Sequence, residues 1–324
     1  MTTIEFEGTK SFGDEVTLKK PESENIPPSE NSFRYLRDSI TITRNYNLKS
    51  LVPGNKSVEM FRAEDLRKDR REVMIKKYLN NHKQYLNEKM IQEMIVAAGG
   101  HPNLLSGSEF IGDERIMISP FLRGGNLKKL LEKTGKLPPK YTKTLMLHLC
   151  RALKKLHENG IIHADVKDSN IGIDILDPQK QEIGRDDLVK YDGSHVFKLF
   201  DYDISYGGRE EHVWAPSRWR FAGSIRYMSP EAIEGALPEP ERDVYAAAVL
   251  GHLLLAGRLP FEGKTEVEIV NKHLHIQPQN VREFNHGVSK ELGMVIEKGL
   301  EKDPNFRFRT IDEFAEAYIG GCRK

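Results

Sequence analysis

The sequence has few cysteines and no excess of charge of either sign. Only Cys150 and Cys322 occur among its 324 residues, which argues against a disulfide framework and predicts a reducing, cytoplasmic location. The 49 lysines and arginines nearly balance the 48 aspartates and glutamates, for a formal net charge of +1. No overall charge would therefore draw the chain onto nucleic acid, and any partner must be recognised by a local site.

Long apolar runs are missing as well. No segment has the roughly 18 uninterrupted apolar residues of a membrane span, and the N-terminus lacks an apolar core of signal-peptide length. Residues 1–32 end in the polar, proline-containing "PESENIPPSENS", a composition that predicts a mobile leader. We expect no membrane span, and the remaining length suffices for one large domain or two lobes.

Hydrophobic periodicity divides the rest of the chain into two regions. In the first, residues 58–64 and 71–78 alternate like strands, residues 86–98 repeat at helical spacing, and residues 115–122 read as a buried strand. Beyond Gly124, helices are predicted over 126–135, 141–160, 243–257, 289–303 and 310–321. The sequence therefore predicts an α+β protein, with a small antiparallel region followed by a mainly helical one.

The segment "IIHADVKDSNIGI", residues 161–173, places polar residues between isoleucines. Asp165 can accept or orient a hydroxyl proton, and Asn170, five positions on, can offer an amide oxygen to a metal. Lys167 can neutralise a moving phosphate. Taken alone, the pattern fits a polar turn capped by aspartate and asparagine equally well.

Two further segments bear on this choice. "VFKLFDYDIS" places Asp201 at the end of an apolar strand, where a carboxylate could bind magnesium. "VMIKKY" places Lys76 on a strand, from which it could reach phosphates and a helix glutamate. Taken alone, a strand lysine is more often simply solvated.

Four motifs, in order, carry a resemblance to a known family. They are "HADVKDSN", "DYD", "GSIRYMSPE" and "DVYAAAVLGHLLLAGRLPF", which resemble the H-R-D-L-K-x-x-N, D-F-G, activation-segment and buried-helix signatures of eukaryotic-type (Hanks-type) serine/threonine protein kinases. The resemblance runs from about Tyr46 to Ala317 and looks most like the bacterial branch. It implies a bilobal fold, with residues 33–122 as the N-lobe and residues 123–324 as the C-lobe.

The resemblance also implies an activity, which is transfer of the γ-phosphoryl group of ATP, with Mg²⁺, to Ser or Thr of a protein substrate. Asp165, Lys167 and Lys76 become catalytic residues, and Asn170 and Asp201 become magnesium ligands. The nucleotide-binding residues would be Gly54, Lys76, Glu93, Phe121, Leu122, Asn126, Asn170 and Asp201. Glu93 is expected to pair with Lys76, although Glu88, one turn earlier, is an alternative.

Supporting roles follow from the same resemblance. Arg307 is expected to pair with Glu231, and His163 to pack near Tyr202. Asp243 is expected to hold the backbone of the catalytic loop from the buried helix.

The phosphate-covering loop departs from the family pattern. "LVPGNKSVEM" keeps Gly54 but has Val52 and Ser57 at the other glycine positions, and it is expected to bring the Glu59 carboxylate near the nucleotide. Met74 would narrow the adenine pocket, and the small gatekeeper Ser119 would return some space.

Other departures concern regulation. Ala164 replaces the arginine of H-R-D, which makes the chain a non-RD type and predicts activity without phosphorylation of the activation segment. Asp203 replaces the glycine of D-F-G, either as a turn cap, which we prefer, or as a further metal contact. Trp214 and Trp219 either pack the activation segment or form a docking surface. An insertion over residues 175–196 is expected to be a solvated hairpin.

Two other functions remain open. A pseudokinase scaffold is favoured by the eroded glycine loop, Met74 and the ambiguous helix glutamate, and is opposed by the presence of Lys76 and the catalytic-loop residues. A small-molecule phosphotransferase shares the catalytic-loop pattern but would lack "GSIRYMSPE".

Overall fold

The computed structural model describes residues 39–55, 57–79, 81–177, 179–180, 183, 193–207 and 224–322. The chain divides into two compact units, Met1–Thr43 and Arg44–Lys324. The expected leader, the segment with Trp214 and Trp219, and most of the insertion lie outside the described residues. In the first unit the description covers only residues 39–43, where Ile42 N donates to Ser39 Oγ at 3.1 Å as helix α2 (Ile40–Asn45) begins.

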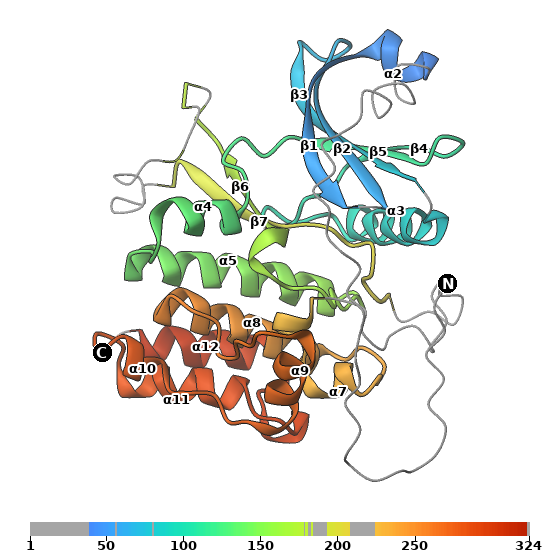
Figure 1. Cartoon of the computed structure of the whole chain (residues 1–324). Helices are drawn as coiled ribbons and strands as arrows, with labels where there is room; N and C mark the ends of the chain where they lie inside the picture. Colours follow the sequence, from blue (N-terminus) through green and yellow to red (C-terminus); the bar gives the residue numbers. More distant parts are fainter. Residues whose placement is uncertain are drawn as a thin grey trace, which may run out of the picture. The chain divides into compact units, whose positions relative to one another are not determined.

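The N-terminal part of the second unit is a five-stranded antiparallel sheet with one long helix (Figure 1). The strand order is β1-β2-β3-β5-β4, with β1 (Tyr46–Asn55), β2 (Val58–Asp65), β3 (Arg71–Tyr78), β4 (Glu109–Ile111) and β5 (Ile116–Pro120). Helix α3 (His82–Ala97) begins where Gln84 N donates to Asn81 Oδ1 at 3.3 Å, an N-cap that satisfies an otherwise unpaired backbone donor.

Strand register decides which side chains share a face of this sheet. Lys76 on β3 lies opposite Met60 on β2 and Met117 on β5, while Glu59 lies opposite Lys77. Successive side chains of a strand point to opposite faces, so Glu59 lies on the face away from Lys76. The expectation that Glu59 brings a carboxylate near the nucleotide is therefore wrong.

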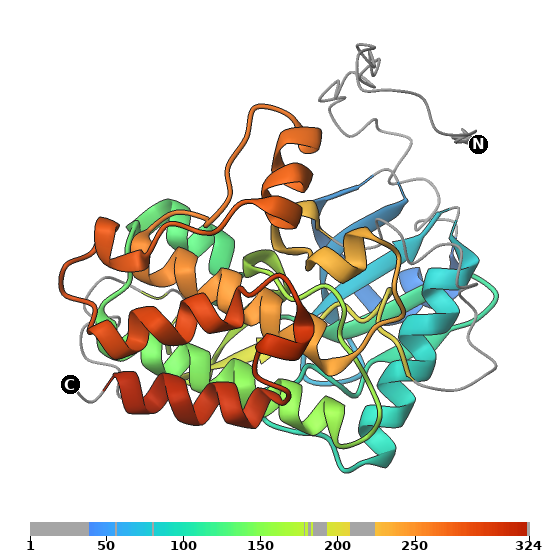
Figure 2. The same cartoon turned by 90° about the horizontal axis from the view of Figure 1, so that it is seen from below.

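The C-terminal part is mainly helical, as expected, and Figures 1 and 2 show it in two views. Its helices are α4 (Leu127–Thr134), α5 (Pro139–His157), α7 (Pro230–Ile233), α8 (Pro240–Ala256), α9 (Glu266–His275), α10 (Val281–Phe284), α11 (Lys290–Gly299) and α12 (Ile311–Gly321). Short 3₁₀ turns are η1 (Asp168–Asn170), η3 (Ile225–Tyr227) and η4 (Pro304–Phe306), and β6 (Ile171–Ile175) pairs with β7 (His195–Leu199).

Helix α8 is the centre of this helical part. It packs against α5, α10, α11 and α12, and almost every one of its side chains is buried, which explains why its sequence is apolar all round. Gly257 ends it in the left-handed conformation at φ 77°, which glycine adopts without strain. In the described part of the chain, no helix combines the length and apolar character needed to cross a bilayer.

The expected ion pair between Arg307 and Glu231 is present. Both terminal nitrogens of Arg307 donate to the carboxylate at 2.7 Å, and the Arg307 side chain is fully buried. This bidentate pair joins α7 to the turn after η4. The α+β architecture predicted from the sequence, a small antiparallel sheet followed by a larger helical part, is confirmed.

Candidate active site

Lys76 joins the sheet, helix α3 and the strand end at Asp201. Its ammonium lies 2.9 Å from Glu88 Oε2 and 2.5 Å from Asp201 Oδ1. Burial acts to lower the pKa of Lys76, but the charges of Asp201 and Glu88 outweigh it and hold that pKa well above its usual value. Burial likewise acts to raise the pKa of Asp201, and Lys76 overcomes it so that the pKa is lowered. Lys76 is therefore charged and fixed between two carboxylates.

The prediction that Glu93 pairs with Lys76 is wrong, because Glu88 fills that position. Glu88 is 1% exposed and shares the buried face of α3 with Ile91, Gln92 and Ile95. Glu93 lies five residues further on, about 140° around the helix. Its side chain is 66% exposed and faces Lys89 at 3.8 Å.

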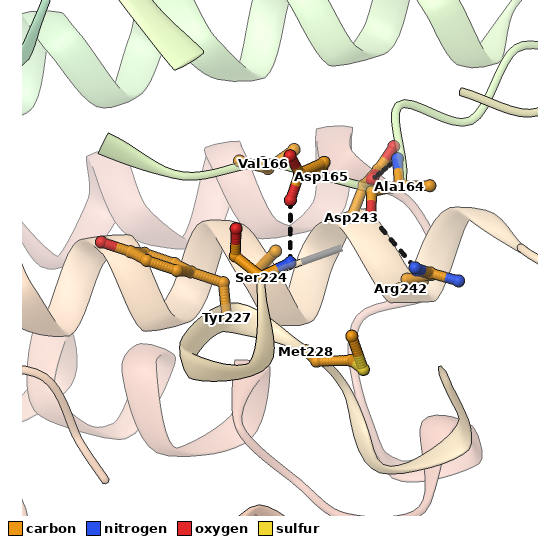
Figure 3. Close-up of a pocket in the computed structure, with 9 residues that line it drawn as sticks. Ala164, Asp165, Val166, Ser224, Tyr227, Met228, Arg242 and Asp243 are labelled. Carbon is orange, nitrogen blue, oxygen red and sulfur yellow. Dashed lines mark hydrogen bonds between the residues drawn. The ribbon is translucent and has the colours of Figure 1, made fainter. Parts of the chain in front are cut away.

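The catalytic-loop residues come together as the sequence predicts. Asp165 Oδ2 accepts hydrogen bonds from Lys167 Nζ at 2.5 Å and from Asn170 Nδ2 at 3.0 Å. Asp165 Oδ1 accepts one from the backbone nitrogen of Ser224 at 3.0 Å, and Lys167 Nζ also donates to Ser224 Oγ at 2.9 Å. Figure 3 shows this junction, where Asp165 faces Ser224 across a small pocket lined further by Tyr227 and Met228. The Asp165 carboxylate is thus held by two side chains of its own loop and by the backbone at the end of the activation segment.

Helix α8 holds the backbone of this loop, as expected for Asp243. The fully buried Asp243 carboxylate accepts from His163 N at 2.8 Å, Ala164 N at 2.9 Å and His157 Nε2 at 2.9 Å. Ala164 has φ 65°, a strained conformation that these bonds sustain. The His163 and Tyr202 rings pack edge to face with centroids 5.5 Å apart, which confirms the expected contact.

One of the expected nucleotide contacts, Leu122, lies against Gly172 of β6. A Cβ added to Gly172 would meet Leu122 Cδ1 at 2.1 Å, so only glycine lets that side chain lie against the strand. Phe121 lies beneath the guanidinium of Arg62, 4.7 Å from its ring centroid. Gly54 lies in β1 near the irregular end of its pairing with β2. Contact of Gly54, Phe121 and Leu122 with a nucleotide stays a prediction.

Asn126 has a structural role in addition to any contact with nucleotide. Its Oδ1 accepts from Lys129 N at 3.0 Å as the N-cap of α4, and its Nδ2 donates to Ser169 O at 3.2 Å. The side chain therefore ties α4 to η1, and its expected contact with nucleotide stays a prediction.

The donor set of the predicted metal site is suited to a hard cation. The Asn170 amide nitrogen donates to Asp165, so the amide oxygen of Asn170 points away from Asp165. Asp201 supplies a carboxylate whose pKa is lowered, so that it carries a negative charge. Both are oxygen donors of the kind Mg²⁺ prefers. Among the described residues no cluster of three or more His, Cys, Asp or Glu could hold a metal ion.

Burial and the charge of Asp201 raise the pKa of Asp203 well above its usual value.

Sequence reasoning missed several residues of this site. Tyr78 OH donates to Glu88 Oε2, and Arg242 donates to Ala164 O at 3.1 Å. Asn87, fully buried on α3, donates to three backbone carbonyls. Asn87 was detectable as a polar residue on the buried face of the helix pattern, whereas the Tyr78 and Arg242 contacts depend on tertiary packing alone.

Comparison with known proteins agrees with this geometry. The model of the protein kinase domain matches residues 60–319. The serine/threonine-protein kinase PrkC of Bacillus subtilis is 27% identical over 278 residues, which is 84% of this chain and 40% of PrkC. The probable serine/threonine-protein kinase SCO3848 of Streptomyces coelicolor is 25% identical over 223 residues, 67% of this chain and 30% of that protein. The serine/threonine-protein kinase PknB of Mycobacterium tuberculosis is 26% identical over 197 residues, 61% of this chain and 29% of PknB.

The chain spans 40% or less of the length of these relatives. The family match, by contrast, covers well over half of the chain itself and contains all the catalytic-loop residues described above. The chain therefore belongs to the protein kinase domain family, in its Hanks-type form and resembling the bacterial branch.

Proposed function

We propose that this chain is an ATP- and Mg²⁺-dependent protein kinase that transfers the γ-phosphoryl group to serine or threonine hydroxyls of a protein substrate. The observation that carries the proposal is the assembly of two clusters, Lys76–Glu88–Asp201 and Asp165–Lys167–Asn170. The names of the relatives, serine/threonine-protein kinases, support the acceptor class.

The residues divide the reaction between them. The acceptor hydroxyl oxygen bonds to the γ-phosphorus while the bond from that phosphorus to the β,γ-bridging oxygen breaks, so ADP is released. The hydroxyl proton passes to the Asp165 carboxylate, and Lys167 neutralises charge on the transferring group. Lys76 holds the phosphates of the nucleotide. Mg²⁺, held by Asn170 and Asp201, would neutralise charge on the phosphate oxygens.

Ser224 supports a hydroxyl acceptor beside Asp165. Its backbone nitrogen and its hydroxyl bond Asp165 and Lys167 respectively, so the end of the activation segment is joined to the loop that would receive the substrate. Ser224 and Asp165 also line one small pocket together with Tyr227 and Met228. A cytoplasmic location, expected from the two cysteines, is part of the same proposal; both are free, and Cys150 is buried.

Transfer of label from ATP tests the proposal. The chain is incubated with Mg²⁺ and γ-labelled ATP, with and without a generic basic protein, beside Asp201→Asn and Asp174→Asn. Asp174 is a matched control because it is a partly exposed carboxylate on β6 that faces Lys198 at 3.7 Å. We expect label on Ser or Thr from the wild type and Asp174→Asn, and none from Asp201→Asn. Absence of any transfer dependent on Asp201 would leave the pseudokinase scaffold as the better account.

A further inference from the structure

Asn87 connects helix α3 to the backbone that follows Asp201. Its side chain is fully buried, and Nδ2 lies 3.2 Å from Tyr202 O, 3.1 Å from Asp203 O and 2.9 Å from Ser205 O. Carbonyl oxygens only accept hydrogen bonds, so these three neighbours fix the amide with its nitrogen towards them. The two N–H groups of Asn87 thus serve three carbonyls of one short segment.

The donor end of this amide is the part that the fold uses. Asn87 Oδ1 has no hydrogen-bond partner in the described part of the chain. Leaving a buried oxygen without a partner is unfavourable, and an apolar residue of similar volume would avoid it. The three donated bonds are therefore the physical reason for an asparagine at this position.

The segment that Asn87 binds is itself bonded to the catalytic loop. Ser205 Oγ donates to His163 O at 2.9 Å. Tyr206 and Ile162 exchange two backbone hydrogen bonds at 2.8 and 2.7 Å. A continuous series of hydrogen bonds consequently runs from α3, through residues 202–206, to the loop that carries Asp165.

Asn87 and its neighbour Glu88 approach the Asp201 region by different routes. Glu88 reaches the Asp201 side chain through Lys76, and Asn87 reaches the backbone immediately after Asp201. A displacement of α3 would break both connections at once. Ala164 places only a methyl group in the catalytic loop where the family has arginine, so the loop offers no cation there to a phosphorylated segment.

We propose that Asn87 is a positioning residue that couples α3 to residues 202–205 and keeps Lys76, Glu88 and Asp201 assembled without a phosphate on the activation segment. The coupling itself is structural, and its consequence for turnover rests on the proposed kinase function. Asn87 touches neither substrate nor the reacting atoms; it acts through the backbone that carries Asp201.

The test compares Asn87→Asp and Asn87→Leu with Asn159→Asp. Asn87→Asp keeps the shape but sets an acceptor against three carbonyls, and Asn87→Leu removes the donor with an apolar residue of similar volume, so a folding failure of one variant leaves the other. Asn159 is a matched control because its Nδ2 also donates to a backbone carbonyl, Lys155 O at 2.8 Å, at the end of α5.

Hydrogen exchange is measured first, without nucleotide, so that it does not depend on activity. Both Asn87 variants are expected to speed exchange in the peptides covering residues 82–97 and 201–207 by roughly 10-fold, since losing 1–2 kcal/mol changes an opening equilibrium by that order. Asn159→Asp leaves both peptides unchanged. Unchanged exchange at both peptides in a folded Asn87 variant overturns the proposal.

Kinetics then separates the tether from the kinase function. With wild-type turnover present, the Asn87 variants should lower kcat by roughly 10-fold and leave KM for the protein substrate unchanged, because substrate contacts are not altered. A rise in KM with kcat unchanged overturns the positioning role. Faster exchange in the variants together with no transfer by the wild type supports the tether and refutes the kinase function instead.

Discussion

Replacing Glu88 and Glu93 separately with glutamine distinguishes a residue of the active site from a solvated one on the same helix. Glu88 is 1% exposed, accepts from Lys76 at 2.9 Å and also accepts from Tyr78 OH. Glu93 is 66% exposed and lies 3.8 Å from Lys89. The substitutions are chemically identical, so any difference between them reports the environment.

The expected magnitude follows from these contacts. Breaking a buried ion pair by removing one partner costs about 3–5 kcal/mol. Lys76 keeps Asp201 as a partner in Glu88→Gln, and glutamine can still accept a hydrogen bond, so the loss should be nearer the value of one charged hydrogen bond, about 1.5–3 kcal/mol. Glu93→Gln loses a surface pair, worth about 0.5 kcal/mol or less.

Urea unfolding and phosphoryl-transfer kinetics measure the two effects. Glu88→Gln should lower the free energy of unfolding by the amount above and reduce kcat/KM by roughly 10- to 100-fold, because each 1.36 kcal/mol of lost transition-state stabilisation is tenfold. Glu93→Gln should match the wild type in both measurements. Equal losses in the two variants, or a larger loss in Glu93→Gln, would refute the assignment of Glu88 as the partner of Lys76.

Three other predictions address stability, pH and regulation. Arg307→Met should lower the free energy of unfolding by about 3–5 kcal/mol, because it leaves the Glu231 carboxylate without its ion-pair partner. Arg309→Met, at an exposed position two residues on, should change the free energy of unfolding little. Similar urea midpoints for the two variants would contradict this. Burial and, to a smaller extent, the charge of Arg307 lower the pKa of Lys302 to about 8 in the folded protein. In the unfolded chain the pKa of a lysine is near 10.4, so between these two pH values the unfolded state binds more protons than the folded state. The free energy of unfolding should therefore increase as the pH rises from about 8 to about 10.4. Lys302→Met should lack that contribution when unfolding is followed against pH, and identical slopes for the two proteins would exclude it. Because Ala164 supplies no cation, phosphatase treatment should leave the wild-type transfer rate unchanged, and loss of turnover would show that the activation segment must be phosphorylated.

Sequence periodicity and motif spacing were sufficient for the long helices, the strands β2, β3 and β5, and the catalytic loop, whereas α7, α9, α10 and β4 were not predicted. The α8 sequence is apolar all round and too short to span a bilayer, so it predicts a buried helix. The Asp165–Asn170 spacing fits one short loop regardless of the rest of the fold. These features depend on local spacing, which the sequence carries directly.

The errors concern how one element is rotated against another. Glu93 has the separation from Lys76 that the family favours, but helical phase places Glu88 on the buried face. Glu59 fits a motif position, but its register with Lys77 turns it away from the Lys76 face. Helical phase places Asn87 on the buried face of α3, but its acceptors are more than 100 residues away in sequence, so no local pattern specifies what it binds.

The most direct test of the account is the rate of phosphoryl transfer by Asp165→Asn, measured with its affinity for Mg²⁺-ATP. Asp165 accepts hydrogen bonds from Lys167, Asn170 and Ser224, and its proposed role is to take the proton of the acceptor hydroxyl. The proposed role of Lys76 and Asp201 is to bind the nucleotide and its Mg²⁺. The account predicts that affinity for nucleotide is retained and that single-turnover transfer to protein falls by roughly 10²- to 10⁴-fold, the range for loss of a general base. An Asp165→Asn protein that transfers phosphoryl groups at the wild-type rate would contradict it.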